Sequence, residues 1–444
     1  MTILANLKQG STGTEVKELQ LILQRLGYNP GTADGIFGPK TMQAVIQFQK
    51  DTSLTPDGIV GPVTWLALQN RDQGYRLYTI QAGDTFYKIA LTFNLNLSSL
   101  LAANPGVDPN KLNIGQKIWL PTSLPKLVLT KSVGGWVPSW LQTQAFRSVQ
   151  NHPDIFSNLS PFWYEVESSG EIIKYTGAED NSLLSFARTH AIKLFPLISN
   201  AFSSEQISAV LNDPLIRRNH VANIVKLLSQ LNYDGIDINY ENLFVKDKEV
   251  FVIFLQELKT ALSPIGKQLI VTVHAKTDPV GDWTGAEAHD YIGIGQTADF
   301  VRIMGYDFHW FGGEPGPIAP ADWIDNVLAY AVSTIPKSKI VLGLPTYGYD
   351  WPLGQEGKGI TYSYAVSTAK RYNAPITEDA QQGPHFTYTA DGVAHEVWFI
   401  DANSFAALLD LVNHYDLNGI VIWYLGAEDP KIYDVIQAKF KASV

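Results

Sequence analysis

The residues best suited to chemistry lie in one short run, residues 234–241, which reads DGIDINYE. Side chains alternate between the two faces of a β-strand, so Asp237, Asn239 and Glu241 share one face. Two like charges on one face raise the pKa of one carboxylic acid, which then stays protonated near neutral pH. Such an acid can protonate the oxygen of a glycosidic bond. The pattern predicts general acid catalysis, and a buried polar network without chemistry is the alternative.

The C-terminal region, residues 126–444, supplies the elements that would position this run. Strand-like stretches alternate there with amphipathic helical stretches. The order predicts an α/β fold, a TIM (β/α)8 barrel, with Glu241 at the end of the fourth strand, on the face where catalytic groups gather. Residues 349–399 lie between the last two strands, and we expect them to form a small inserted α+β subdomain. The eight expected strands are Gly134–Val137, Ser160–Val166, Lys193–Ile198, Gly235–Glu241, Leu269–His274, Phe300–Tyr306, Ile340–Tyr347 and Gly419–Tyr424; expected helices include Ile216–Leu231 and Lys248–Leu262.

Two similar segments near the N-terminus form an internal repeat. Residues 33–41 read ADGIFGPKT and residues 56–64 read PDGIVGPVT, each an Asp-Gly turn signal followed by a helix start. The repeat indicates a small helical domain over residues 1–70, which resembles the peptidoglycan-binding domain of many wall hydrolases. The resemblance rests on Gly10, Leu19, Gln20, Leu26, Gly27, Tyr28, Asp34, Gly35, Phe37, Gly38, Phe48, Gln49, Asp57 and Gly58.

A second small module is expected at residues 75–121, in the order strand, helix, helix, strand. This βααβ order, with Gly83, Asp84 and Thr85 after the first strand, resembles a LysM module. The resemblance implies that loops 83–86 and 104–112 bind chains of N-acetylglucosamine, although turn formation alone would also explain individual residues. The expected strands are Tyr78–Ile80 and Lys117–Leu120, the helices lie around Ile89–Phe93 and Leu97–Ala103, and linkers lie at residues 70–74 and 121–125.

The C-terminal region resembles family 18 of the glycoside hydrolases, the chitinase-like barrels. DGIDINYE is similar to the family signature DGxDxDxE, and three further segments follow in the family's order. These are IMGYD at 303–307, LGLPTYGYDW at 342–351 and IVIWYLG at 420–426. Together with VWFIDANS at 397–404, they favour the branch of spore-cortex-lytic N-acetylglucosaminidases, which also carry LysM modules.

The resemblance implies roles for individual residues. Glu241 would donate the proton and later activate water, and Asp237 would hold and tune the carboxylate pair. Tyr306, with Asp307, would bond the acetamido group of the substrate. Trp423 would form the floor of the sugar-binding subsite, and Met304 would line it. The alternative is that these two side chains only fill the core of the barrel.

The chain departs from the family pattern at two places. The third Asp of the signature is Asn239 here, and an amide can orient the acetamido group without adding negative charge. The family's SxGG segment on strand three reads Ser199–Asn200–Ala201–Phe202. We still expect activity with Asn239 in place of the aspartate, and we expect the change at residues 199–202 to affect fine specificity for the substrate.

Composition narrows the function classes. The 444 residues suggest about three domains. The net charge is −10, yet residues 1–121 carry a net of +2, so the N-terminal part is not repelled by anionic wall polymer. No basic stripe suits nucleic acid, no apolar run is long enough to span a membrane, and no signal peptide is visible. Without cysteine, HExxH, GxSxG or a complete phosphate loop, we expect no metal and no cofactor.

These observations favour an enzyme that cleaves peptidoglycan after N-acetylglucosamine, plausibly in spore cortex. A chitinase is the alternative enzyme, and a non-catalytic wall-binding lectin, with Asn239 marking lost activity, is the third hypothesis. The expected partner is a peptidoglycan or chitin-type polysaccharide, the expected location is the cell exterior, wall or spore surface, and a monomer is expected.

Overall fold

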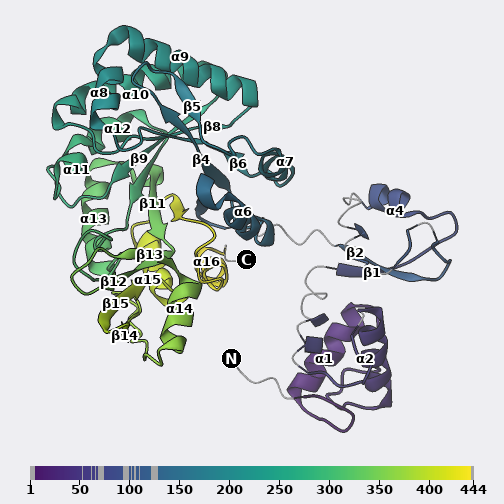
Figure 1. Cartoon of the computed structure of the whole chain (residues 1–444). Coiled ribbons are helices and arrows are strands. Elements are labelled where there is room, and N and C mark those ends of the chain that lie inside the picture. Colours follow the sequence, from purple (N-terminus) through teal and green to yellow (C-terminus); the bar gives the residue numbers. More distant parts are fainter. Residues whose placement is uncertain are drawn as a thin grey trace. The chain divides into compact units, whose positions relative to one another are not determined.

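The structure is a computed structural model and describes residues 6–52, 54–61, 63–65, 67–68, 75–93, 100–101, 103–104, 107–109, 111–121 and 129–441 (Figure 1). The chain divides into two compact units, residues 1–126 and 127–444, and each is described by itself. The expected linker at residues 70–74 lies outside the described residues, as do most of the expected linker at residues 121–125 and most of the expected helix Leu97–Ala103; Pro121 is the last residue of a strand.

The first unit begins with two helices, α1 (Thr14–Arg25) and α2 (Pro39–Asp51). Pro39 suits the start of α2 because the first turn needs no donor from its nitrogen. Isolated antiparallel bridges join Leu7 to Val60 and Thr12 to Ile36. Its apolar core includes Val16, Leu19, Leu23, Leu26, Phe37, Val45, Phe48 and Leu68.

One hydrogen-bond network occurs twice in this unit and explains the sequence repeat. The amide nitrogen of Gln20 donates to Asp34 (3.0 Å), while its amide oxygen accepts from the backbone N–H of Gly35 (2.9 Å). Gln49 bonds Asp57 (2.8 Å) and the N–H of Gly58 (2.9 Å) in the same way. Both Asp-Gly turns are thus fixed by a buried glutamine, and both glycines have positive φ.

The second module contains strands β1 (Tyr75–Thr79) and β2 (Lys117–Pro121), paired antiparallel, and helix α4 (Phe86–Thr92). The strands and the first helix agree with the expected order. Ile80, Phe86, Ile89, Leu100, Ile118 and Leu120 form its core.

The second unit is built on a closed barrel of eight parallel strands. The hydrogen-bonded order is β3-β16-β11-β10-β9-β8-β7-β4, and a β3–β4 pairing closes the ring. The barrel strands are β3 (Ser132–Pro138), β4 (Asn158–Val166), β7 (Leu197–Ser199), β8 (Gly235–Asn239), β9 (Gln268–His274), β10 (Phe300–Met304), β11 (Ile340–Pro345) and β16 (Gly419–Trp423). Two shorter strands pair with β4: β5 (Ile172–Lys174) antiparallel and β6 (Lys193–Leu194) parallel.

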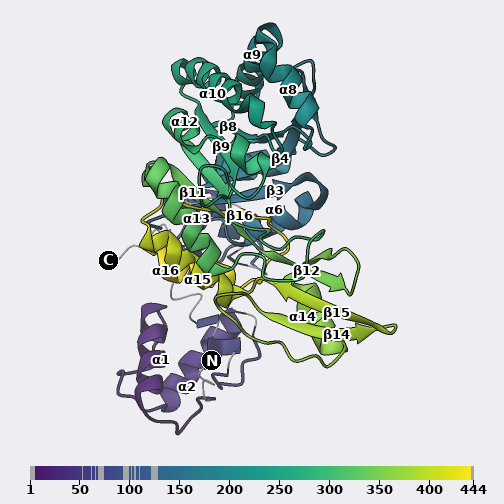
Figure 2. The same ribbon diagram turned by 90° about the vertical axis from the view of Figure 1, so that its left-hand side faces the viewer.

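Helices pack around this barrel (Figure 2). The long helices α9 (Pro214–Leu231) and α10 (Lys248–Leu262) confirm the two helices expected from the sequence. No helix in the described ranges is both long and apolar enough to cross a membrane. The helices are α6 (Gln142–Asn151), α7 (Asn181–Thr189), α8 (Ser204–Asn212), α9 (Pro214–Leu231), α10 (Lys248–Leu262), α11 (Thr284–Ala288), α12 (Tyr291–Thr297), α13 (Ala321–Thr334), α15 (Ala402–His414) and α16 (Ile432–Phe440), with short 3-10 turns at Ser139–Leu141, Val245–Asp247, Ser263–Ile265 and Lys337–Lys339.

The TIM barrel expected from the sequence is therefore confirmed, with local differences in two strands. The third strand is split into β6 and β7 around Pro196, because proline lacks the N–H that a continuous ladder needs. The fourth strand, β8, ends at Asn239, so Glu241 lies in the loop that follows it.

The expected insertion is a four-stranded antiparallel sheet with one helix, at the right-hand end of Figure 2. The strand order is β13-β12-β15-β14, and Ile360, Ala365, Phe386, Val397 and Phe399 form a core of its own. Its elements are β12 (Tyr347–Pro352), β13 (Lys358–Thr361), α14 (Tyr362–Arg371), β14 (His385–Ala390) and β15 (Val393–Phe399).

The duplicated network predicts a local loss of stability. Gln49→Leu leaves the N–H of Gly58 and the carboxylate of Asp57 without their partner, which should cost about 1–3 kcal/mol. Hydrogen exchange followed by mass spectrometry on the full chain should show faster exchange across residues 54–61. Gln47→Leu is the matched control, because the side chain of exposed Gln47 donates to half-buried Asp51 on the same helix. Equal exchange in both variants would contradict this role for Gln49.

Candidate active site

Glu241 lies at the C-terminal face of the barrel, two residues beyond the end of β8. Asn200 holds its backbone from the neighbouring loop. The side-chain oxygen of Asn200 accepts from the N–H of Glu241 (2.9 Å), and its side-chain nitrogen donates to the carbonyl of Glu241 (2.8 Å). The backbone of Glu241 is therefore fixed by two bonds from one buried side chain.

The departure from SxGG at residues 199–202 has a structural counterpart. Ala201 and Phe202 have φ of 48° and 60°, which is left-handed backbone that glycine adopts at little cost. The chain keeps a glycine-like backbone there with side chains in place. Phe202 is 58% exposed and lines both cavities beside Glu241.

Asp237 is buried in the barrel interior and is bonded from three other strands. Nη1 of Arg302 on β10 donates to its Oδ2 (2.5 Å), as does the indole N–H of Trp136 on β3 (2.9 Å). The hydroxyl of Thr272 on β9 donates to Oδ1 (2.8 Å). Arg302 is also bonded to Asn158 and Ser160, so the pair belongs to a larger buried network.

Glu241 has the altered acidity that a proton donor needs. The pKa of Glu241 is raised to about 7: burial is the largest cause, the hydrogen bond from Asn239 opposes it, and the negative charge of Asp307 adds to it. The expected coupling to Asp237 is wrong as the cause, because the charge of Asp237 is matched by Arg302.

Asn239 is the last residue of β8, and its side chain contacts the carboxylate of Glu241. Its amide nitrogen donates to Oε1 of Glu241 (3.0 Å). Its amide oxygen is buried and makes no hydrogen bond to any described residue. A buried acceptor of this kind is costly unless water or a ligand in the cavity donates to it.

A cavity of about 460 Å³ opens beside Glu241 over the end of the barrel. Asn239, Met304, Tyr306, Asp307 and Trp423, all expected in the site, line it together with Glu241. The rings of Tyr306 and Trp423 stack at 6.4 Å between centroids. Aromatic walls of this kind bind the apolar faces of sugar rings.

Asp307 is held in place by two tyrosines from β12. The hydroxyls of Tyr347 (2.5 Å) and Tyr349 (3.0 Å) both donate to its Oδ1. Burial raises the pKa of Asp307, and these two hydrogen bonds oppose the shift. The first strand of the insertion therefore takes part in building the site.

A second cavity, of about 740 Å³, lies on the other side of Glu241. Its walls include His274, the last residue of β9, and three tryptophans, Trp283, Trp310 and Trp323. Glu241, Met304, Tyr306 and Asp307 line both cavities. The acid thus lies between two spaces, as required of a group that acts on a bond joining two sugars.

The three LysM residues expected to bind sugar are bonded within their own loop. The carboxylate of Asp84 accepts from Tyr78 (2.8 Å) and from the N–H of Gln81 (2.7 Å). The hydroxyl of Thr85 accepts from the N–H of Lys88 at the start of α4, and Gly83 has φ of 82°. Their side chains shape the turn, so a sugar role for residues 83–85 stays a prediction.

Four residues of the site were missed from the sequence: Trp136, Arg302, Thr272 and His274. A sequence signal existed for three of them. Arg302 and Met304 alternate along β10, as Thr272 and His274 do along β9, and an arginine inside an apolar strand calls for a buried partner.

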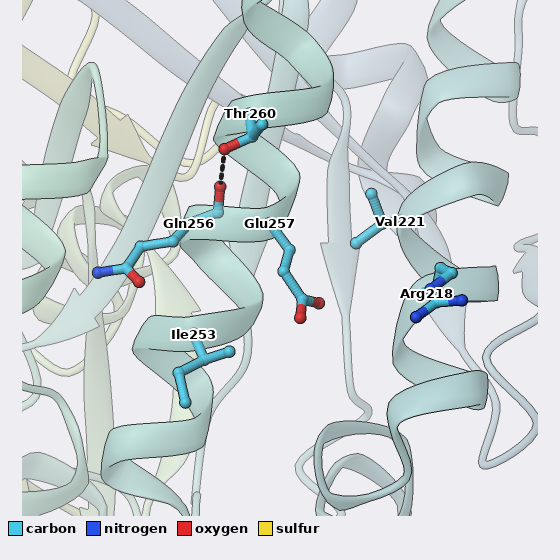
Figure 3. Close-up of a pocket in the computed structure, with 6 residues that line it drawn as sticks. All are labelled: Arg218, Val221, Ile253, Gln256, Glu257 and Thr260. Carbon is cyan, nitrogen blue, oxygen red and sulfur yellow. Dashed lines mark hydrogen bonds between the residues drawn. The ribbon is translucent and has the colours of Figure 1, made fainter.

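A hollow of about 450 Å³ also lies between α9 and α10, on the outside of the barrel (Figure 3). Its lining residues are Arg218, Val221, Ile253, Gln256, Glu257 and Thr260, and the hydroxyl of Thr260 bonds the carbonyl of Gln256 within α10. Glu257 already pairs with Arg217 through two hydrogen bonds. The cavities at Glu241 are therefore the stronger candidates for a catalytic site.

The buried ion pair predicts a non-additive effect on stability. Arg302→Met should destabilise the fold by about 3–5 kcal/mol, because it leaves the carboxylate of Asp237 buried without its cation. Adding Asp237→Asn should restore part of that loss, since the remaining group is neutral. Denaturant unfolding of both variants tests this, and a double variant less stable than Arg302→Met would contradict it.

Comparisons with known proteins agree with this geometry. The sequence profile of glycosyl hydrolases family 18 matches residues 156–428, and profiles of a putative peptidoglycan binding domain and a LysM domain match residues 12–68 and 78–121. The putative sporulation-specific glycosylase YdhD of Bacillus subtilis is 33% identical over 368 residues, which are 79% of this chain and 84% of that protein.

Two solved structures are similar to most of this chain. The spore cortex-lytic enzyme SleL of Bacillus megaterium superposes with a TM-score of 0.65 at 32% identity, over 83% of this chain and 87% of its own. A chitinase of Chromobacterium violaceum gives a TM-score of 0.66 at 28% identity, over 70% of this chain and 98% of its own. Since the family profile covers more than half of the sequence, the chain belongs to family 18 of the glycosyl hydrolases.

Proposed function

We propose that this glycoside hydrolase cleaves bacterial peptidoglycan after N-acetylglucosamine, with spore cortex among its substrates and with retention of anomeric configuration. Glu241 is the proton donor in this proposal. The observation that carries the mechanism is the buried, unpartnered amide oxygen of Asn239 beside Glu241. In this proposal, that oxygen accepts the N–H of an acetamido group, which neighbouring sugars of the glycan carry.

The other carboxylates near the acid are already engaged, which supports substrate-assisted catalysis. Asp237 is paired with Arg302, and Oδ1 of Asp307 accepts two tyrosine hydroxyls. A retaining enzyme with a protein nucleophile needs a second carboxylate about 5 Å from the acid, whereas family 18 uses the substrate instead. Asn239 and Tyr306 would then orient the acetamido group, whose carbonyl oxygen attacks the anomeric carbon as Glu241 protonates the leaving oxygen.

The N-terminal region supports the choice of polymer. Residues 1–70 and 75–121 are proposed as wall-binding modules and residues 126–444 as the catalytic barrel. Two modest sites on one chain increase retention on a repetitive polymer. We place the protein at the cell wall or spore surface and propose that it is a monomer.

One assay tests the substrate. The full chain is incubated with purified peptidoglycan, spore-cortex fragments and chitin oligomers, and reduced products are identified by mass spectrometry. Products ending in N-acetylglucosamine from the first two polymers support the proposal. Turnover of chitin oligomers alone would make the protein a chitinase, and binding without turnover would make it a lectin.

The acidity of Glu241 predicts the alkaline limit of activity. Because its pKa is about 7 and the protonated form is the donor, kcat/KM should fall tenfold per pH unit above about pH 7. Glu241→Gln should lower kcat by several orders of magnitude at every pH, with unfolding and wall binding unchanged. A variant that retains more than a few per cent of activity would place the acid elsewhere.

Asn239 predicts a contrast between two substitutions. Asn239→Ala removes the donor to Glu241 and the acceptor for the acetamido group, so kcat/KM should fall by about 10²–10³-fold. Asn239→Asp keeps an acceptor and should stay active, with the alkaline limit moved to higher pH because a like charge then faces Glu241. Proton NMR of the first product should show retained configuration, and inverted product would exclude the substrate-assisted route.

A further inference from the structure

His274, the last residue of β9, lies against the acid on the side of the larger cavity. Its Nε2 is 3.8 Å from Oε2 of Glu241. This nitrogen is buried, and no group in the described ranges is hydrogen-bonded to it. The other carboxyl oxygen, Oε1, already accepts from Asn239. The two carboxyl oxygens of Glu241 therefore differ. Oε1 accepts a hydrogen bond from Asn239, whereas Oε2 faces Nε2 of His274, which is hydrogen-bonded to no described group.

Several contacts fix the position of the His274 ring. Its backbone N–H donates to Nδ1 of His289 (3.0 Å), and its carbonyl accepts from the hydroxyl of Tyr291 (2.6 Å). The ring stacks on His289 at 5.2 Å and meets Trp283 edge-on at 4.5 Å. A ring held in this way can determine the orientation of the group it faces.

The surroundings keep this ring neutral. Burial lowers the pKa of His274 well below its usual value, and His289 adds to the shift. His289 is itself neutral, because burial lowers its pKa to about 4 and its Nδ1 accepts while its Nε2 bonds the carbonyl of Tyr240. The other titratable groups nearby are Lys276, which donates to the carbonyl of His289, and three residues that line the same cavity, Asp282, Tyr306 and Asp307.

We propose that His274 is a positioning residue for Glu241: its unprotonated Nε2 accepts the hydrogen of the protonated carboxyl at Oε2. The donor bond from Asn239 occupies Oε1, so the proton is kept on the oxygen that faces the larger cavity. This inference rests on the proposed role of Glu241 as the acid. A movement of about 1 Å brings the two atoms into hydrogen-bond range, and such bonds are often long before substrate binds.

The proposed role of His274 predicts the direction in which the pKa of Glu241 changes when His274 is replaced. A hydrogen bond to the protonated form of a carboxyl disfavours its ionisation and so raises its pKa. Removing the acceptor should therefore lower the pKa of Glu241, by roughly 0.5–1 unit for a hydrogen bond of ordinary strength. Gln can present an acceptor at the same reach as Nε2, whereas Leu presents none.

The test is an NMR titration of the Glu241 carboxyl carbon in the full chain, labelled with ¹³C-glutamate and assigned by its loss in Glu241→Gln. His274→Leu should move the midpoint to lower pH by roughly 0.5–1 unit, and His274→Gln should keep most of the wild-type value. His414→Gln is the matched control, because that histidine is exposed at the end of α15. If His274→Leu does not fold, His274→Met replaces it, since it is also apolar and reaches as far.

Two results would overturn the proposal: a wild-type midpoint in His274→Leu, or equal shifts in the Leu and Gln variants, which would make the effect one of packing. The alkaline limit of kcat/KM should move with the NMR midpoint. The titration needs no substrate, so a wild-type protein that cleaves no glycan would refute the proposed function while the midpoints still decide the role of His274.

Discussion

The ion pair between Asp237 and Arg302 is the constraint on which the active site depends. A closed barrel has a single interior, and a bare carboxylate there would destabilise the fold by several kcal/mol. Side chains from β3, β9 and β10 together satisfy the carboxylate that β8 brings in. With Asp237 fixed and neutralised, the acidity of Glu241 is determined by burial, Asp307 and Asn239 rather than by a shared proton inside the barrel.

The exchange of a signature aspartate for Asn239 is consistent with this arrangement. Arg302 already supplies the positive charge that Asp237 needs, so the interior is electrically balanced without a second acid. An amide at position 239 offers a donor to Glu241 and an acceptor to the cavity at every pH. In the proposed mechanism, Asn239 keeps the orienting function of the family residue and gives up its charge.

Features that depend on local sequence pattern could be predicted from the sequence. Alternation along β8 placed Asp237, Asn239 and Glu241 on one face, and the apolar strand pattern predicted the barrel and its insertion. The break at Pro196 and the partners of Asp237 were missed. Those partners, Trp136, Thr272 and Arg302, lie far apart in the chain and meet only because the ring closes. The cause of the raised pKa of Glu241 was also predicted wrongly. Coupling to Asp237 was expected, but the sequence does not show that Arg302 pairs with Asp237.

The two tyrosines that hold Asp307 have a consequence for engineering. Tyr347 and Tyr349 stand on β12, which is also the strand that pairs with β13 and β15 in the insertion. The insertion is therefore anchored in the catalytic centre by its own first strand and is not an appendage on a loop. A shortened enzyme made by trimming this sheet would lose the clamp on Asp307, so any minimal version of the barrel has to keep β12 and the strands that support it.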